Sequence, residues 1–218
     1  MIGLGRAEEL LAGCQTLTGQ VPSAEQTGHL LAFLDLLSHW NQSYNLTAIR
    51  DPAEMVSRHL LDSLAVMPWL YGSSVLDVGT GGGLPGVPLA VMNPALEVTL
   101  LDSVGKKIRF LRHVKRELGL SNVYPVQSRL EQFTAASASS EPFTTVISRA
   151  FSELGEFARA SRHLMHADTR LLAMKGRFPE QELKALPEWV RVEKTEKLSI
   201  PGLHEQRHLV IMSLSASP

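Results

Sequence analysis

The stretch Val75-Leu76-Asp77-Val78-Gly79-Thr80-Gly81-Gly82-Gly83-Leu84-Pro85-Gly86 decides the fold of this chain. It begins as a short apolar run, reaches an acid, and then places five glycines within eight residues ahead of a helical apolar pattern. Glycine is needed where the backbone has a positive φ or must approach a ligand without a Cβ atom in between. The stretch predicts a buried strand, a tight turn and a helix start whose free N–H groups suit a polar ligand. We therefore expect a nucleotide-type site at the end of this strand.

The same glycines fit more than one class of cofactor. The pattern Gly81-x-Gly83-x-x-Gly86 matches the dinucleotide fingerprint, in which an acid about twenty residues further on binds the ribose. Asp102 occupies that place, at the end of a predicted strand over 98–102. A dinucleotide is therefore one alternative, and a strand–turn–helix without any ligand is another.

The loop also matches the acid-x-Gly-x-Gly-x-Gly pattern of methyltransferases that use S-adenosylmethionine (SAM). In those enzymes the acid before the loop faces the amino-acid end of the cofactor. The acid after the next strand would bind the ribose hydroxyls with either cofactor, and the loop itself favours SAM. We expect the cofactor to be SAM, bound by Asp77, Gly79, Gly81 and Asp102.

Composition and charge are those of an ordinary soluble globular protein. The chain has 218 residues, of which 44% are hydrophobic and 20% charged. No apolar run approaches the roughly 18 residues of a membrane span. The single Cys14 excludes an intramolecular disulfide and suggests a reducing compartment. The net charge of −1 means that any RNA contact must come from a local patch, and the eight histidines show no coherent metal-ligand spacing, so we expect no metal.

The first 70 residues are predicted to be helical. Ser23-Ala24-Glu25-Gln26 is a capping box ahead of an amphipathic pattern, and Asp51-Pro52-Ala53-Glu54 is a second helix start. From Ser74 onward strands and helices alternate, which predicts parallel strands with helices on both faces. The expected strands are 74–78, 98–102, 123–127, 143–148 and 169–174. The expected helical stretches are 86–92, 105–118, 129–133 and 153–166.

The end of the chain departs from this alternation. Two strand-like runs, 189–200 and 207–214, are separated only by a Pro-Gly turn region and can pair as an antiparallel hairpin. A dehydrogenase Rossmann domain would be parallel throughout and would need a further substrate domain. The predicted fold class is therefore α/β: the Rossmann-like fold of SAM-dependent methyltransferases, with a mostly parallel sheet and a C-terminal antiparallel hairpin strand. We expect an N-terminal helical extension over 1–70 and a SAM-binding methyltransferase domain over 71–218.

Basic residues gather where ligands of open parallel sheets bind, outside the carboxyl ends of the strands. Four of them follow the third, fourth and fifth strands: Arg129, Arg149, Lys175 and Arg177. Such a cluster can hold the SAM carboxylate and also nucleic-acid phosphates. Lys106 and Lys107, at the same edge, are further candidates for RNA contact, whereas the other cations of that helix are expected to form a solvated face.

The fourth strand end bears on the acceptor atom. Methyltransferases that act on an exocyclic amine usually place Asn/Asp-Pro-Pro-aromatic there, but this chain has Ile147-Ser148-Arg149-Ala150-Phe151. It offers no acceptor for amine hydrogens and no cysteine to add to a pyrimidine. The acceptor should therefore already be nucleophilic, as guanine N7 is, and its alkylation needs alignment rather than a general base.

Seven segments resemble one known family over nearly the whole chain. They are Trp40-Asn41-x-x-Tyr44-Asn45-Leu46-Thr47, Arg58-His59-x-Leu61-Asp62-Ser63, the glycine loop 77–86, Leu101-Asp102-Ser103-x-Gly105-Lys106-Lys107, Gln127-Ser128-Arg129, Ile147-Ser148-Arg149-Ala150-Phe151 and Lys175-Gly176. The chain resembles the bacterial 16S ribosomal RNA (guanine-N7) methyltransferase G family, first called glucose-inhibited division protein B. The Leu-Pro-Gly after the glycines and the Ser-Arg-Ala segment are far more specific than the loop alone.

The resemblance implies a cytoplasmic enzyme that moves the SAM methyl group to N7 of one guanine in the decoding region of 16S rRNA. Its partner would be 16S rRNA or a small-subunit assembly particle, with no membrane and no obligate protein partner. Carried over by position, the cofactor-binding residues are Gly79, Leu84, Leu130, Glu131 and Arg149. Arg149 is also the candidate catalytic residue, because it would reach either the cofactor or the target base. From the residues alone, a small-molecule methyltransferase and a SAM-binding sensor without catalysis stay open.

Overall fold

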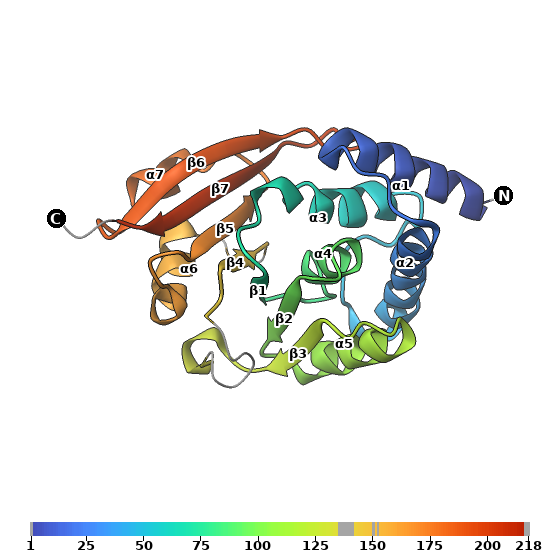
Figure 1. The fold of residues 1–218 in the computed structure, drawn as a ribbon, viewed down its shortest axis with the longest axis horizontal. Helices are drawn as coiled ribbons and strands as arrows, with labels where there is room; N and C mark the ends of the chain where they lie inside the picture. The colour runs from blue at the N-terminus through green and yellow to red at the C-terminus, as the bar shows by residue number, and fades with distance from the viewer. Residues whose placement is uncertain (1, 135–141, 150, 152, 216–218) are drawn as a thin grey trace.

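A seven-stranded sheet with the order β3-β2-β1-β4-β5-β7-β6 forms the centre of the molecule (Figure 1). The computed structural model describes residues 2–134, 142–149, 151 and 153–215. Its strands are β1 (Ser74–Val78), β2 (Glu97–Asp102), β3 (Val123–Gln127), β4 (Thr145–Ser148), β5 (Arg170–Lys175), β6 (Val190–Leu198) and β7 (Arg207–Leu214). The strands β1 to β5 are parallel, and β7 is antiparallel to both β5 and β6. The predicted fold class, including the C-terminal hairpin, is confirmed.

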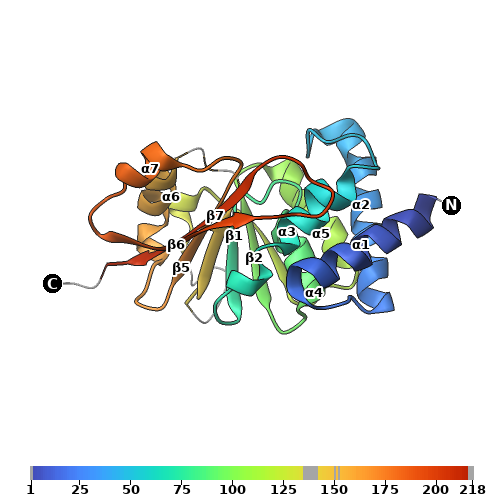
Figure 2. The ribbon, with the colours of Figure 1, turned by 90° about the horizontal axis from the view of Figure 1, so that it is seen from above.

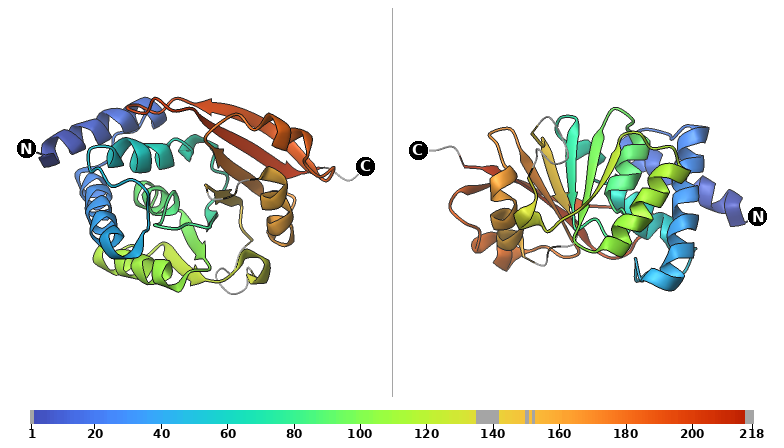
Figure 3. Two further views of the ribbon diagram at one scale, coloured as in Figure 1. Left: turned by 180° about the vertical axis from the view of Figure 1, so that it is seen from behind. Right: turned by 90° about the horizontal axis from the view of Figure 1, so that it is seen from below.

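Helices cover both faces of this sheet. They are α1 (Ile2–Thr18), α2 (Ala24–Tyr44), the π-helical η1 (Val56–Leu61), α3 (Asp62–Leu64), α4 (Gly86–Met92), α5 (Gly105–Glu117), α6 (Leu154–Ser161), α7 (Glu180–Lys184), and the 3-10 turns η2 (Met67–Trp69), η3 (Leu130–Gln132) and η5 (Arg162–Leu164). Seen from above, α1 to α5 lie on one side of the sheet and α6 and α7 on the other (Figure 2). The view from below shows α5 lying alongside α2 (Figure 3), where the ring centroids of Trp40 and Phe110 are 5.5 Å apart.

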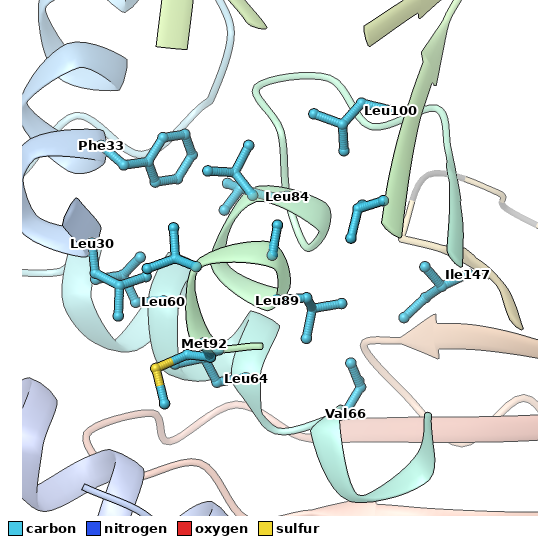
Figure 4. Close-up of a cluster of buried hydrophobic side chains, with 14 of the residues drawn as sticks. Leu30, Phe33, Leu60, Leu64, Val66, Leu84, Leu89, Met92, Leu100 and Ile147 are labelled. Atoms are coloured by element: carbon cyan, nitrogen blue, oxygen red, sulfur yellow. The ribbon is translucent and has the colours of Figure 1, made fainter. Parts of the chain in front are cut away.

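The two faces of the sheet contribute to two hydrophobic clusters. In β1, Val75 belongs to the cluster under α1 to α5 and its neighbour Leu76 to the cluster under α6, because successive side chains of a strand point to opposite faces. Figure 4 shows the first cluster, in which Phe33 from α2 and Leu60 from η1 lie near Leu84 of the glycine loop. The expected domain boundary at residue 70 falls between α3 and α4 in the sequence. Helices from both sides of it contribute side chains to this one cluster.

The predicted capping box is present and sets the position of α2. The Gln26 backbone N–H donates to Ser23 Oγ, and the Ser23 N–H donates to Gln26 Oε1. The Gln26 side-chain amide also donates to the carbonyl oxygens of Val91 and Met92 at the end of α4. Helix α2 ends at Tyr44, and its C-cap Asn45 has a φ of +50°, so the chain changes direction there.

Several predicted boundaries differ from the structure. The expected helix start at 51–54 is a turn, closed by the Ala53 N–H that donates to Asp51 Oδ1, and helical backbone begins with η1. The stretch 129–133 forms only the single 3-10 turn η3, with its two large apolar side chains buried. The expected helix 153–166 is α6 followed by η5, within which His163 Nε2 hydrogen-bonds the Phe133 carbonyl. These short segments lack the sustained periodicity from which a boundary can be predicted.

Candidate active site

Two cavities open at the carboxyl ends of the parallel strands. The strand order reverses direction at β1, which has β2 on one side and β4 on the other, and open α/β sheets bind ligands at such a switch point. The β1–β3 cavity has a volume of about 330 Å³ and is lined by Val78, Gly79, Leu101, Asp102, Ser103, Val104, Lys107, Ser128, Arg129, Leu130, Glu131 and Phe151. The β4–β5 cavity has a volume of about 450 Å³ and is lined by Leu46, Thr47, Ala48, Ile49, Arg58, His59, Asp62, Arg149, Met174, Lys175, Gly176 and Arg207.

Asp77 supports the glycine loop from beneath. Its carboxylate is 0% exposed, and Oδ2 accepts hydrogen bonds from Thr80 Oγ1 at 2.7 Å and from the Gly86 N–H at 2.8 Å. The first N–H of α4, which we expected to be free for a ligand, is therefore taken by the protein. Burial raises the pKa of Asp77 to about 6, and its Oδ1 has no hydrogen-bond partner among the described residues.

The glycine loop closes on Asp102. Gly79 and Gly81 have φ values of +66° and +59°, which side chains with a Cβ rarely adopt. The Gly81 N–H donates to Asp102 Oδ2 at 3.0 Å, and Lys107 Nζ donates to the same oxygen at 3.0 Å. The Val104 N–H donates to Oδ1 at 2.9 Å. These three contacts fix the carboxylate in the wall of the β1–β3 cavity.

The sequence-predicted site residues divide between the two cavities. Those that line the β1–β3 cavity are Gly79, Asp102, Arg129, Leu130 and Glu131. Those that line the β4–β5 cavity are Arg149 and Lys175. Leu84 is buried in the core, Lys106 and Arg177 are exposed on the surface, and Ala150 of the fourth-strand segment lies outside the described residues.

A buried carboxylate joins two arginines in the β4–β5 cavity. The Asp62 side chain is 3% exposed, and its Oδ2 accepts a hydrogen bond from Arg149 Nη1 at 3.1 Å. Its Oδ1 accepts from Arg207 Nε at 3.0 Å. Reasoning from individual residues pointed to Arg149 but not to Asp62 or Arg207. Asp62 does lie in one of the segments that carry the family resemblance.

His59 is held neutral beside this group. A carbonyl can only accept, so His59 Nδ1 donates to the Arg58 carbonyl at 3.1 Å, and Nε2 accepts from Thr47 Oγ1 at 3.0 Å. Burial, with the charge of Arg149, lowers the pKa of His59 to about 4. The Thr47 N–H in turn donates to Asn41 Oδ1. These bonds connect the two N-terminal motifs, 40–47 and 58–63, into one wall of the cavity.

The cations of the β4–β5 cavity are matched by carboxylates. Arg149 and Arg207 share one aspartate, and Arg58 pairs with Glu54 and Glu205. Lys175 is 11% exposed and pairs with Glu182 at 2.9 Å. With four cations paired to four carboxylates and a neutral histidine, the cavity carries little net charge. Such a lining suits an uncharged heterocycle better than a phosphate.

The strand order, the glycine loop and the acid at the end of β2 define a SAM-dependent methyltransferase. Solved structures share this fold: a SAM-dependent methyltransferase from Aquifex aeolicus has a TM-score of 0.58 at 17% identity, over 77% of this chain and 96% of that chain. The mitomycin 7-O-methyltransferase MmcR has a TM-score of 0.59 at 16% identity, over 98% of this chain and 68% of that chain.

Closer relatives assign the family. The model of the GidB family, described as rRNA small subunit methyltransferase G, matches residues 26–210. The ribosomal RNA small subunit methyltransferase G of Pseudomonas aeruginosa strain UCBPP-PA14 is 53% identical over 211 residues, which cover 96% of each chain. Its counterpart from Salmonella arizonae is 51% identical over 187 residues, covering 86% of this chain and 88% of that one. The chain belongs to the rRNA small subunit methyltransferase G family.

Two features are absent from the part of the chain that the structure describes. No helix in them has both the length and the apolar character needed to cross a bilayer. Within the same ranges, no three His, Cys, Asp or Glu side chains gather as ligands for a metal ion.

Proposed function

We propose that this protein transfers the methyl group of SAM to N7 of a guanine in the decoding region of 16S rRNA. The observation that carries the proposal is the pairing of two adjacent cavities, one built for a nucleoside and one with a nearly neutral polar lining. Relatives named as small-subunit rRNA methyltransferases support it. The substrate is 16S rRNA or a small-subunit assembly particle, and the compartment is the cytoplasm.

The residues of the β1–β3 cavity fit SAM. Asp102 Oδ1 accepts one hydrogen bond and keeps a lone pair for a ribose hydroxyl, and the positive φ of Gly79 lets the backbone approach a ligand closely. Leu130 and Glu131 offer an apolar contact and a carboxylate to the adenine. When bound, the cofactor supplies an electrophilic methyl group. Asp77, Gly81 and Leu84 act from behind the wall by fixing the loop.

The β4–β5 cavity receives the target guanine. N7 carries a lone pair and no proton, so the reaction needs alignment and no general base. Arg149 is the catalytic residue: its guanidinium donates to O6 of the base and leaves N7 free for the methyl group. Its anchor, Asp62, keeps the guanidinium from turning toward a phosphate.

Cations at the sheet edge where the cavities open bind the RNA backbone. Lys106, Arg129 and Arg177 are exposed and have no carboxylate partner among the described residues, so their charges are available to phosphates. Lys175 is paired with Glu182, so its contribution to phosphate binding is the smaller one. These four residues flank the two cavities and would guide a single-stranded segment across them.

The decisive experiment is methyl transfer from labelled SAM to 16S rRNA taken from cells that lack this protein. We expect one 7-methylguanosine to form with the wild-type enzyme and none with Arg149→Gln, while calorimetry shows whether the variant still binds SAM. Label on a small molecule and none on rRNA would refute the proposal. Binding of SAM without any transfer would instead support a sensor.

A further inference from the structure

Phe178 presents its ring to solvent at the edge of the sheet where the cavities open. Its side chain is 49% exposed, and it is the most exposed aromatic residue of the described chain. It follows β5 in the segment between Lys175 and α7. A partner that covers this ring would remove its apolar surface from water, which is favourable.

The ring is held in place. It meets the imidazole of His208 edge to face, with centroids 5.6 Å apart and an angle of 71° between the planes. His208 is buried on β7, directly opposite Lys175 in the strand register. The next residue, Pro179, is also buried and begins the turn into α7. Phe178 is therefore held by one ring contact while about half of its surface stays exposed.

The position of the ring relates it to the β4–β5 cavity. Gly176 lines that cavity, and Phe178 follows two residues later, so their Cα atoms are at most about 7 Å apart. Arg177, between them, is exposed. Tyr71, another exposed aromatic at 41%, lies before β1 at the opposite edge and is covered by the Arg170 guanidinium at 4.6 Å.

We propose that Phe178 stacks on the base of a nucleotide next to the target guanine. This inference rests on the proposed function, because a guanine that enters the β4–β5 cavity must leave its neighbours, whose faces then lose their stacking partner. Proteins replace such stacking with exposed aromatic rings, and the charge of Arg177 suits the phosphate of the same nucleotide. Phe178 thereby selects the single-stranded, unstacked form of the substrate.

The test compares Phe178→Ala, Phe178→Leu and Phe178→Tyr on unmethylated small subunits and on extracted 16S rRNA. We expect Phe178→Ala to bind both roughly ten-fold more weakly, which is ~1.4 kcal/mol. Phe178→Leu should show most of that loss, since it keeps apolar volume without a π face, and Phe178→Tyr should restore binding. The slope of affinity against salt should stay unchanged, because stacking releases no counterion. SAM affinity should also be unchanged.

Tyr71→Ala is the matched control, an exposed aromatic removed from the opposite edge of the sheet, and should leave RNA binding intact. Wild-type affinity in Phe178→Ala, or full affinity in Phe178→Leu, would overturn the proposal. If the variant lost affinity for subunits but not for extracted rRNA, Phe178 would contact a ribosomal protein instead of a base. That result would also overturn the proposal. Methyl transfer by the wild-type enzyme is measured in parallel. If it occurs, the proposed function holds, and any of the outcomes above then bears on Phe178 alone.

Discussion

The carboxylate of Asp62 accepts a hydrogen bond from the guanidinium of Arg149 at 3.1 Å, across 87 positions of the chain. This contact joins the N-terminal helices to the end of β4. The other carboxylate oxygen is bound by Arg207, so three parts of the chain meet at one buried charge.

Asp62→Asn should therefore affect both stability and catalysis. Two guanidinium groups would lose their shared anion, and breaking a buried ion pair costs on the order of 3–5 kcal/mol, less here because both arginines are partly exposed. We expect urea denaturation to show a loss of about 2 kcal/mol or more and single-turnover methyl transfer to slow, with SAM affinity preserved. Glu205→Gln, which breaks only an exposed pair with Arg58, should cost under about 1 kcal/mol. Equal effects of both substitutions would contradict this role.

Substitutions in the glycine loop should abolish cofactor binding. Gly79→Val places a branched side chain at a φ of +66° in the wall of the β1–β3 cavity, so calorimetry should detect no SAM binding. Asp102→Ala should weaken binding by roughly 1–3 kcal/mol, because it also releases the Gly81 N–H. Gly28→Ala is the control, since its added Cβ would meet no atom within 4 Å beyond the adjacent backbone of its own helix. Unchanged SAM affinity in both site variants would place the cofactor elsewhere.

Two buried titrating groups should oppose each other in the pH dependence of stability. Asp77 has a pKa of about 6 instead of 3.8, so the folded state holds its proton more tightly, and its contribution to stability falls as pH rises from about 4 to 6. His59 has a pKa of about 4 instead of 6.5, so the unfolded state binds its proton more tightly, and stability rises over nearly the same window. Each effect is on the order of 3 kcal/mol.

Replacing one of these two residues should reveal the effect of the other on the pH dependence of stability. The free energy of unfolding of Asp77→Asn, measured with urea between pH 4 and 7, should rise with pH because only the His59 effect remains. His59→Gln should show the reverse slope. Identical pH profiles for the wild type and both variants would show that neither shift exists.

The rate of methyl transfer should be nearly independent of pH between about 6.5 and 9. Guanine N7 has no proton to remove, and the shifted pKa values of Asp77 and His59 both lie below this range. Single-turnover rates at saturating substrates measure this directly. Borohydride and aniline cleavage of the product, with mass spectrometry, should show 7-methylguanosine. A steep rise of the single-turnover rate with pH, as expected if one proton had to be removed, would refute the mechanism. So would N2-methylguanine as the product.

Arg177→Gln and Lys175→Gln should differ in their effect on RNA binding. Arg177 is exposed, and loss of one phosphate contact should flatten the dependence of log affinity on log salt by about 0.7–0.9. Lys175 is mostly buried against Glu182, so its removal should change this slope less while costing more stability. Filter binding over a salt series, with SAM calorimetry beside it, gives both values. A larger change of slope in Lys175→Gln than in Arg177→Gln would mean that Lys175, and not Arg177, makes the stronger phosphate contact.

Local patterns in the sequence were sufficient to predict the central sheet. The apolar run before the glycines, the alternation of strands and helices, and the Pro-Gly turn near residue 201 each depend on neighbouring residues, and the structure has all three. The place of Asp102 at the end of β2 followed from the same alternation.

The contacts of the β4–β5 cavity could not be predicted in this way. Asp62 and Arg207 are 145 positions apart, and no periodic pattern relates them. His59 and Asp62 are three positions apart, which is a same-face spacing in a helix, and both line this cavity. That spacing does not indicate which distant residues the two side chains meet. Only the family resemblance drew attention to 58–63, and it said nothing about which residues this segment would meet.

The shared core under α1 to α5 has a consequence for how the chain acquires its structure. Phe33 and Leu60 are synthesised before the glycine loop and β2, against which their cluster is completed. The nascent N-terminal helices must therefore wait, with apolar surface uncovered, until the middle of the chain has emerged. A fragment that begins at residue 71 would lack both that cover and the aspartate that anchors Arg149. Cooperativity between the two segments thus ties the appearance of the catalytic arrangement to completion of the whole fold.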